Sequence, residues 1–539
     1  MTTPAPVLDI RGLTVSLPAG ADRDHAVEEI DLQVFPKEIV CVVGESGSGK
    51  SVTAHAVMGL LPKRELRPIA GSIHLAGEPL LEKSPAELRD LRGARMSMIF
   101  QEPFTALNPV MRVGDQIEEV LTIHTDMSAS ARRERVLDVM KDVRLPEPEG
   151  LIDVYPHQLS GGQRQRIMIA AALALEPALL IADEPTTALD VTTQAQILTL
   201  IKDIQASHDT GVLFITHDFG VVAEIADRVV VMQHGRVVES GPAEQVLTAP
   251  EHPYTRMLIG SVPSLIPKTR DGEADDNTVL ATRDLAKTYR SSGLFQKVRE
   301  VQAASNVNIS LQRGETLGIV GESGSGKSTV ARCIVRLIDP TSGAILVDDE
   351  DIANVPTSRL HDYRQKVQIV FQDPYRSLNP RRTVGQSIIE GPMNFGLERQ
   401  AALTRAQELM SLVDLDPNAL DRLPHQFSGG QRQRICIARA LAMQPEILIA
   451  DEAVSALDVS VQAQVLELLD EIKKRFNLAM LFITHDLRVA AQVCDRIAVM
   501  QQGEVVEQGP VETVFSSPAH DYTRALFEAA PGRDLGVNI

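Results

Sequence analysis

An eight-residue sequence occurs twice in this chain, letter for letter, as Gly44-Glu45-Ser46-Gly47-Ser48-Gly49-Lys50-Ser51 and as Gly321-Glu322-Ser323-Gly324-Ser325-Gly326-Lys327-Ser328. Both copies fit G-x-x-x-x-G-K-[ST], in which glycines let backbone N–H groups surround nucleotide phosphates. Apolar runs of strand length precede the loops, at residues 39–43 and 316–320, and apolar residues continue at helical spacing after the second copy, at Val330, Ile334, Leu337 and Ile338. We therefore expect two strand-loop-helix units that bind phosphate.

Each loop carries groups suited to a phosphate and its metal ion. The helix N-terminus supplies a partial positive charge, and Lys50 or Lys327 adds a full one. The hydroxyl of Ser51 or Ser328 can bind Mg²⁺, and Thr329 continues the second loop into its helix. The sequence therefore predicts two sites for a nucleotide with Mg²⁺.

Long segments of the chain also repeat outside the loops. Leu8 is matched by Leu280 (280 − 8 = 272), Gln101 by Gln372 (372 − 101 = 271) and Ser160 by Ser428 (428 − 160 = 268). A repeat of this length is a domain duplication. We expect one domain at residues 1–262 and a second at 279–539. Residues 263–278, with Asp271, Glu273, Asp275 and Asp276, are interpreted as an exposed tether or a short ordered surface loop.

The composition narrows the class of protein. The formal net charge of −19 argues against a body built to coat nucleic acid. The four cysteines lie far apart, which favours neither a disulfide framework nor a zinc site and suits a reducing cytoplasm. No run approaches the roughly 18 apolar residues of a membrane span, and the start resembles no export signal. If the protein acts at a membrane, we expect other subunits to cross it.

Within each half, strand-like apolar runs alternate with helical patterns, which is typical of an α/β fold with a covered parallel sheet. Asp183-Glu184 and Asp451-Glu452 end two such runs. His217 and His485 end the next ones, at equal separations (217 − 183 = 34 and 485 − 451 = 34). The carboxyl ends of the strands form the edge at which such sheets bind ligands. Residues 102–173 and 373–441 are largely helical in pattern, and we expect an inserted helical subdomain there.

These strand-end residues suit nucleotide hydrolysis. Asp183 and Asp451 are placed to support Mg²⁺, and Glu184 and Glu452 to polarise the attacking water. His217 and His485 are expected near the γ-phosphate, and Gln101 and Gln372 near the Mg²⁺ or the water. A single strand-end histidine is more often structural, but recurrence in both halves favours function.

A second anion site is predicted in each half, at a serine and two glycines that begin a helix. Its residues are Ser160, Gly161, Gly162 and Gln163 in the first half and Ser428, Gly429, Gly430 and Gln431 in the second, followed by arginines at 164, 166, 432 and 434. One ATP needs only one phosphate loop. The second anion site therefore requires a separate explanation.

These motifs occur in the same order in both halves, and together they resemble those of the ATPase of an ABC transporter. The resemblance implies two phosphate-loop (RecA-like) nucleotide-binding domains, each with an inserted helical subdomain and a small β region. It identifies Ala188-Leu189-Asp190 and Ala456-Leu457-Asp458 as D-loops and the S-G-G-Q segments as signatures. In this family two domains pair head to tail, so that each ATP lies between the loop of one and the signature of the other.

Narrower features resemble the dipeptide, oligopeptide and nickel importer branch. They are Leu107-Asn108-Pro109 and Leu378-Asn379-Pro380 after the glutamines, and the tails His252-Pro253-Tyr254-Thr255-Arg256 and His520-Asp521-Tyr522-Thr523-Arg524. The resemblance implies two transmembrane permease subunits and an extracytoplasmic solute-binding protein as partners, at the cytoplasmic face of a bacterial membrane. The permeases are expected to dock near residues 101–116 and 372–386.

Three features depart from the family pattern. Tyr289 matches the aromatic residue that stacks on adenine, but the equivalent in the first half is Leu17 (289 − 272 = 17). Ala453 stands where the first half has Pro185, beside an intact glutamate. No cysteine follows the tail motifs closely, so we expect no iron-sulfur cluster.

The sequence thus predicts an ATP-hydrolysing importer subunit, with dipeptides or oligopeptides as the first choice of solute. Nickel, glutathione or a sugar are alternatives. A rival class is a soluble tandem ABC ATPase acting on ribosomes or DNA. That class predicts a basic or long charged interdomain segment or zinc cysteines, whereas the acidic residues at 271–276 and the scattered cysteines favour a transporter without nucleic acid.

Overall fold

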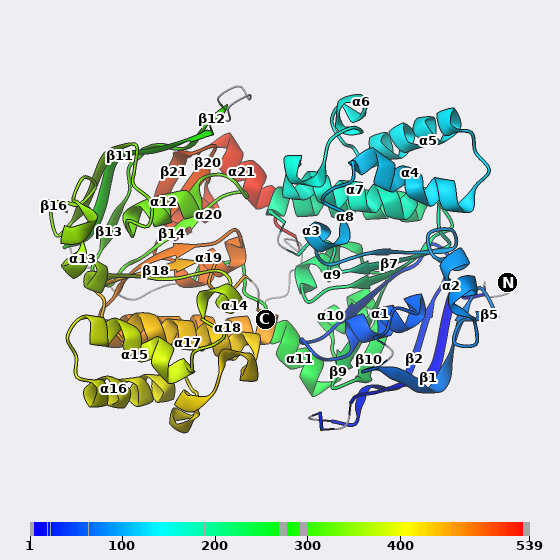
Figure 1. Ribbon diagram of the computed structural model, residues 1–539, viewed down its shortest axis with the longest axis horizontal. Helices are drawn as coiled ribbons and strands as arrows, with labels where there is room; N and C mark the ends of the chain where they lie inside the picture. The colour runs from blue at the N-terminus through cyan, green and yellow to red at the C-terminus, as the bar shows by residue number, and fades with distance from the viewer. Residues whose placement is uncertain are drawn as a thin grey trace. The chain divides into compact units, whose positions relative to one another are not determined.

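The computed structural model in Figure 1 describes residues 5–18, 20–21, 23–62, 64–187, 189–268, 277–291, 299–455 and 457–531. The chain separates into two compact units, one that runs to Val262 and one from Pro263 to Ala530. Each unit is described by itself.

The first unit is organised around β3, whose five residues are all buried. It lies inside a six-stranded sheet of order β10-β9-β3-β8-β7-β6, in which only β10 runs antiparallel to its neighbour. A second, antiparallel sheet has the order β2-β1-β4-β5. The strands are β1 (Leu8–Ser16), β2 (His25–Val34), β3 (Ile39–Val43), β4 (Arg67–Leu75), β5 (Glu78–Pro79), β6 (Met96–Ile99), β7 (Leu179–Asp183), β8 (Gly211–Ile215), β9 (Arg228–Gln233) and β10 (Arg236–Pro242).

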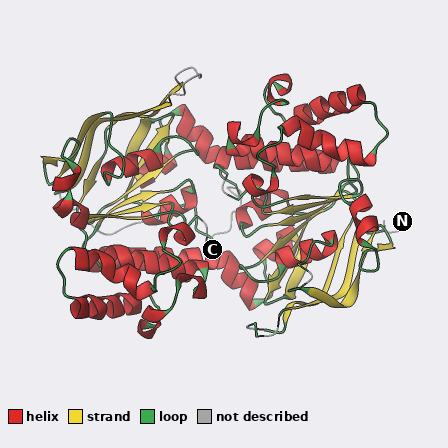
Figure 2. Ribbon diagram, viewed as in Figure 1, coloured by secondary structure: helices red, strands yellow, loops and turns green. Residues whose placement is uncertain are grey.

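The helices of the first unit include a group inserted between β6 and β7, which Figure 2 shows set apart from the strands. The inserted elements are α3 (Pro103–Ala106), α4 (Val113–His124), α5 (Ala129–Asp142), α6 (Pro148–Leu151), η1 (Pro156–Gln158) and α7 (Gly161–Leu173). The others are α1 (Lys50–Met58), α2 (Pro85–Leu91), α8 (Val191–Ser207), α9 (Phe219–Ile225), α10 (Ala243–Thr248) and α11 (Pro253–Gly260).

The second unit repeats this topology, with a main sheet of order β17-β18-β19-β14-β20-β21 and a second sheet of order β12-β11-β15-β16, in which β13 also pairs with β11. Its strands are β11 (Thr278–Ser291), β12 (Arg299–Val307), β13 (Ser310–Gln312), β14 (Thr316–Val320), β15 (Ser342–Val347), β16 (Glu350–Asp351), β17 (Val367–Val370), β18 (Ile447–Asp451), β19 (Ala479–Ile483), β20 (Arg496–Gln501) and β21 (Glu504–Pro510). Its helices are α12 (Lys327–Ile334), η2 (Thr357–Arg359), α13 (His361–Lys366), α14 (Pro374–Ser377), α15 (Val384–Asn394), α16 (Arg399–Leu412), η3 (Pro417–Asp421), η4 (Pro424–Gln426), α17 (Gly429–Leu441), α18 (Val459–Phe476), α19 (Leu487–Val493), α20 (Val511–Ser516) and α21 (Asp521–Glu528).

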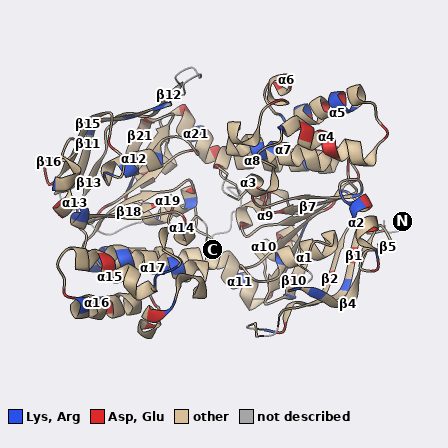
Figure 3. Cartoon of the chain, in the orientation of Figure 1, with Lys and Arg blue, Asp and Glu red and all other residues tan. Residues whose placement is uncertain are grey.

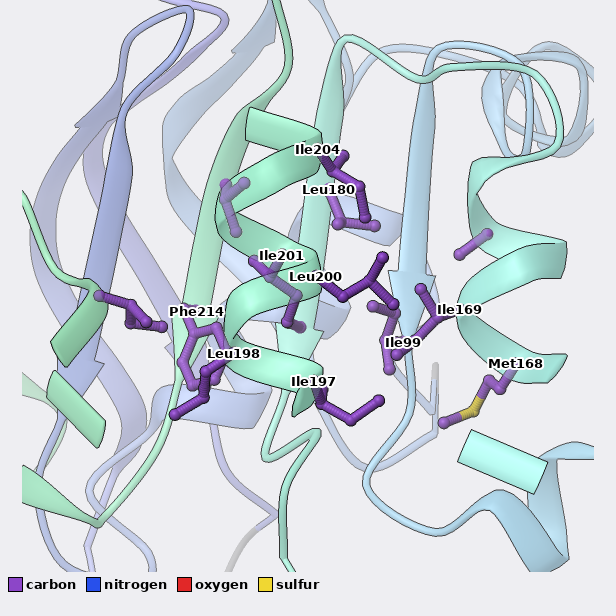
Figure 4. Packing of buried hydrophobic residues seen from close by; sticks show 14 of the residues in the cluster. Ile99, Met168, Ile169, Leu180, Ile197, Leu198, Leu200, Ile201, Ile204 and Phe214 are labelled. Atoms are coloured by element: carbon purple, nitrogen blue, oxygen red, sulfur yellow. The ribbon is translucent and has the colours of Figure 1, made fainter. Parts of the chain in front are cut away.

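Helix α8 shows how the sheet of the first unit is covered. Ile197, Ile201 and Ile204 recur at helical spacing and are buried. Figure 4 shows them in one cluster with Leu180 of β7 and Phe214 of β8. Packing of this kind fixes the strand ends from which the polar residues of the site emerge.

The structure confirms the predicted fold, two phosphate-loop α/β domains with inserted helical subdomains. One detail is different. The helix after the second loop ends at Ile334 and does not continue to Ile338. Arg336 takes a φ of 54°, and Leu337 is 57% exposed, so its apolar side chain belongs to a turn.

The predicted tether lies partly outside the described residues, including its acidic residues at 271, 273, 275 and 276. Its described residues are 263–268 and 277–278, of which Thr278 begins β11 and the stretch 263–268 contacts α19 of the second unit. Gln492 Nε2 donates to the carbonyl oxygens of Ser264 and Ile266, both at 2.9 Å. Figure 3 shows Lys and Arg among Asp and Glu on the helices of both units. None of the helices in the described ranges combines the length and apolar character of a membrane span.

Candidate active site

The phosphate loop of the first unit joins β3 to α1 under close steric limits. Gly44 has a φ of 149°, and a Cβ built on it would lie 2.2 Å from the carbonyl oxygen of Met232. Only glycine fits there, because a side chain would collide with backbone. At Gly47, with a φ of 77°, an added Cβ would meet nothing within 4 Å. The loop is therefore tight at its first glycine and open at its middle one.

Lys50 begins α1 and turns its side chain back over the loop. Its Nζ atom donates to the carbonyl oxygens of Gly44 at 2.6 Å and Glu45 at 2.9 Å. In the second unit, Lys327 donates to the equivalent oxygens of Gly321 and Glu322, both at 2.8 Å. A buried ammonium group in an open glycine loop at a helix N-terminus fits nucleotide phosphates.

The other loop residues lie in the same two turns. They are Ser46, Ser48, Gly49 and Ser51 in the first unit and Ser323, Gly324, Ser325, Gly326, Ser328 and Thr329 in the second. Ser325 Oγ is buried and has no hydrogen-bond partner in the described part of the chain. An unsatisfied polar atom inside the loop also fits a site built for a polar ligand.

A serine-aspartate pair of oxygens lies beside each loop. Ser51 Oγ donates to Asp183 Oδ1 at 3.1 Å, and Ser328 Oγ donates to Asp451 Oδ1 at 2.9 Å. Burial raises the pKa of both aspartates, and the serine hydrogen bonds oppose it only in part. A divalent cation would offset this cost, and Mg²⁺ prefers oxygen ligands of this kind. The two pairs therefore fit Mg²⁺.

Glu184 is held in place from several directions. It follows β7 with a φ of 48°, which is uncommon for a residue other than glycine. Its carboxylate accepts hydrogen bonds from Gln101 Nε2 and Thr187 Oγ1, both at 2.9 Å. Its Oε1 atom lies 3.3 Å from His217 Nδ1. The predicted glutamine, glutamate and histidine thus meet at one edge of the sheet, and Gln101 contacts the glutamate.

The second unit has the same cluster with one difference. Gln372 Nε2 donates to Glu452 Oε2 at 2.6 Å, and His485 Nδ1 lies 3.4 Å from Glu452 Oε1. Ser455, which stands in the place of Thr187, donates to the backbone carbonyl oxygen of Glu452 at 3.0 Å and leaves the carboxylate to other donors.

Both glutamates are ionised at neutral pH. Burial would raise the pKa of Glu184, but His217, Thr187 and Lys50 outweigh it and lower the pKa to about 2. Burial is likewise outweighed at Glu452, where His485 and Lys327 lower the pKa. Burial would lower the pKa of His485, but Glu452 raises it. An ionised carboxylate is the form that a proton acceptor needs.

The S-G-G-Q segments cap α7 and α17. Ser160 Oγ accepts from the backbone N–H of Gln163 at 3.2 Å, and Gln163 Oε1 accepts from the N–H of Ser160 at 2.9 Å. Ser428 and Gln431 form the same capping box. Arg164 is buried and donates to backbone carbonyls of its own subdomain, so it supports the segment from inside.

The two glycines of each segment differ in their surroundings. A Cβ on Gly162 would lie 2.8 Å from Thr193 Cγ2, and one on Gly430 would lie 2.3 Å from Val461 Cγ1. These second glycines allow α7 to pack closely against α8, and α17 against α18. A Cβ on Gly161 would meet nothing within 4 Å, and one on Gly429 would meet only the Tyr375 hydroxyl, at 3.5 Å.

The predicted roles of Tyr289, Leu17 and the D-loops remain predictions. Tyr289 of β11 is 41% exposed, with Lys287 Nζ 5.3 Å from its ring centroid. Leu17 is partly buried and packs against the apolar cluster of its unit. Ala188 and Ala456 of the D-loops lie outside the described residues.

Sequence reasoning missed contacts made by Thr187 and by the tail tyrosines. Tyr254 Oη accepts a hydrogen bond from the backbone N–H of Glu45 at 3.1 Å, and Tyr522 Oη accepts one from Glu322 at 3.1 Å. From the sequence, both tyrosines are predicted only as marks of a family branch. Their equal spacing (522 − 254 = 268) is the signal that could have pointed to a shared role.

Comparison with known proteins agrees with this geometry. A family profile described as "ABC transporter" matches residues 27–187 and 304–455. The chain belongs to the ABC transporter family. Each match contains one phosphate loop and one signature segment, and the domains of ABC ATPases bind ATP. A second profile, "Oligopeptide/dipeptide transporter, C-terminal region", matches residues 238–290 and 506–535.

The similarity to known proteins extends over nearly the whole of this chain. "Glutathione import ATP-binding protein GsiA" of Salmonella paratyphi A is 46% identical, over 98% of this chain and 90% of that protein. The protein of the same name from Escherichia coli O157:H7 is also 46% identical, over 97% and 89%. A solved dimer of the ATP-binding cassette MJ0796 with ADP and Pi aligns with 44% of this chain and 98% of that one, at 29% identity and a TM-score of 0.40.

Proposed function

We propose that this ABC ATPase energises the import of a short peptide, a class that includes dipeptides, oligopeptides and the tripeptide glutathione. Support for the solute class comes from the matched C-terminal region and from the relatives named for glutathione import. The dipeptide preference predicted from sequence is therefore widened to peptides that include glutathione.

The cluster of glutamine, glutamate and histidine, present in both units, is the observation that carries the hydrolytic part of the proposal. Glu184 and Glu452 accept a proton from the attacking water, and His217 and His485 orient the reacting groups. Lys50 and Lys327 bind phosphate. The oxygens of Ser51, Asp183, Ser328 and Asp451 hold Mg²⁺, and Gln101 and Gln372 link this site to the helical subdomain.

The S-G-G-Q segments complete the ATP sites in this proposal. Each unit has one phosphate loop and one capped helix N-terminus with an open first glycine, which is a second place for an anion. A head-to-tail arrangement uses both, because each segment then closes the loop of the other unit. The domains at 1–262 and 279–539, joined by 263–278, are the units of this arrangement.

The partners in this proposal are two permease subunits and an extracytoplasmic solute-binding protein, with the ATPase at the cytoplasmic face of the membrane. The experiment is uptake of labelled glutathione and of a labelled dipeptide by cells that carry the complete set of subunits. If the Lys50→Ala, Lys327→Ala double variant loses the uptake of one of these solutes, the proposal is supported. If the variant takes up both solutes as well as the unaltered protein does, the proposal is refuted.

A further inference from the structure

The C-terminal helix of each unit reaches the phosphate loop through one tyrosine. Tyr254 of α11 is 6% exposed, and its hydroxyl oxygen accepts the backbone N–H of Glu45 at 3.1 Å. The same hydroxyl donates to Glu45 Oε2 at 3.3 Å. In the second unit, Tyr522 of α21 accepts the N–H of Glu322 at the same distance of 3.1 Å.

The tail segment holds this tyrosine by a set of local bonds. Glu239 of β10 accepts the backbone N–H groups of Glu251 at 2.8 Å and His252 at 3.1 Å. The His252 ring accepts the N–H of Tyr254 at 3.2 Å and so caps α11. The second unit repeats these contacts with Glu507, Ala519, His520 and Tyr522. The tail is therefore hydrogen-bonded to the sheet at the residues that directly precede its tyrosine in the chain.

The hydroxyl of Tyr254 bonds the peptide group that joins Gly44 to Glu45. Its N–H donates to Tyr254 and its carbonyl oxygen accepts Lys50 Nζ at 2.6 Å. Gly44 itself lies against the carbonyl oxygen of Met232. If Lys50 turns to the phosphates of ATP, the hydrogen bond to Tyr254 still restrains the orientation of this peptide.

We propose that Tyr254 and Tyr522 are positioning residues of the two ATP sites, whose hydroxyls fix the first peptide of each phosphate loop. This inference rests on the proposed function only in taking these loops as ATP sites. A tyrosine that merely filled space would need its ring alone, and phenylalanine would replace it. Without the hydroxyl, the part-buried N–H of Glu45 loses this acceptor, so the change to phenylalanine should disturb the loop.

The test is ATP binding and turnover in Tyr254→Phe, Tyr522→Phe and the double variant, with Tyr155→Phe of the helical subdomain as matched control. We expect the Kd for a fluorescent ATP analogue and the KM for ATP to rise about 3- to 10-fold at the altered site, with kcat at saturating ATP within about twofold. Kd values of both single variants equal to that of the control would overturn the positioning role. Failure of the unaltered protein to bind ATP would instead refute the proposed function.

If the variants do not fold, hydrogen exchange in the unaltered protein provides the test. Because the tyrosine joins α11 to the loop, ATP should slow exchange in the peptide 253–260 as well as in the peptide 44–51. Slower exchange in the loop alone, with α11 unchanged, would overturn the inference.

Discussion

Gln101 donates a hydrogen bond from Nε2 to Oε2 of Glu184 at 2.9 Å, and so joins the entry of the helical subdomain to the carboxylate at the end of β7. The second unit repeats the bond between Gln372 and Glu452. A movement of this segment that displaces Gln101 would therefore change the bonding of the predicted proton acceptor. This gives the two predicted functions of the segment, permease docking and support of hydrolysis, a direct physical link.

Replacing the proton acceptor should stop hydrolysis and spare ATP binding. We expect Glu184→Gln and Glu452→Gln each to lower ATP turnover about 100-fold or more, because the amide keeps the shape but cannot accept a proton. Turnover is measured by phosphate release and binding by titration with a fluorescent ATP analogue. Full turnover in either variant would remove that glutamate from its role.

The hydroxyls of Thr187 and Ser455 should have unequal effects. Thr187 bonds the carboxylate of Glu184, whereas Ser455 bonds a backbone oxygen. A hydrogen bond to a charged group is worth about 1.5–3 kcal/mol, so Thr187→Val should lower turnover several-fold. Ser455→Ala should change it less than about twofold. Equal losses in steady-state phosphate release would contradict this difference between the sites.

The two glycines of the first signature should separate stability from activity. Gly162→Ala places a Cβ 2.8 Å from Thr193 and should lower the free energy of unfolding by about 1–3 kcal/mol. Gly161→Ala meets no neighbour and should leave thermal stability unchanged or slightly higher, as alanine favours a helix. We expect it to lower ATP turnover all the same, because the ATP of the other unit would lie there. Unchanged turnover in Gly161→Ala would count against this part of the account.

The pH dependence of stability should report on Glu239. Burial would raise the pKa of this carboxyl, but hydrogen bonds that include the backbone N–H groups of Glu251 and His252 lower it. Because its pKa is lower in the folded state, the ionised Glu239 stabilises the fold. This stabilisation is fully present above the ordinary pKa of 4.5 and is lost as the pH falls through the pKa of the folded state. Glu239→Gln should therefore lower the melting temperature at pH 7, with a difference that shrinks below pH ~4. A difference independent of pH in thermal melts would contradict this.

Sequence predicted the fold and which polar residues meet at the strand ends, because both depend on patterns along the chain. Strand β3 is fully buried, so its apolar run was unambiguous, and Glu184 and His217 follow such runs directly. The contact of Tyr254 with Glu45 joins residues 209 positions apart, and no local pattern encodes it. The different bonds of Thr187 and Ser455 depend on side-chain rotation, which sequence does not give.

In the proposed function, each S-G-G-Q segment closes the loop of the other unit. In the hydrolysis-deficient Glu184→Gln, Glu452→Gln protein, cysteines placed at Ser46 and Gly429 can be joined by a short bis-maleimide, because the four natural cysteines are buried. Cysteines at Ser46 and Gly161, within one unit, form the control pair. The account predicts ATP-dependent cross-linking of Ser46→Cys with Gly429→Cys and none in the control. Cross-linking of the control pair alone would contradict it.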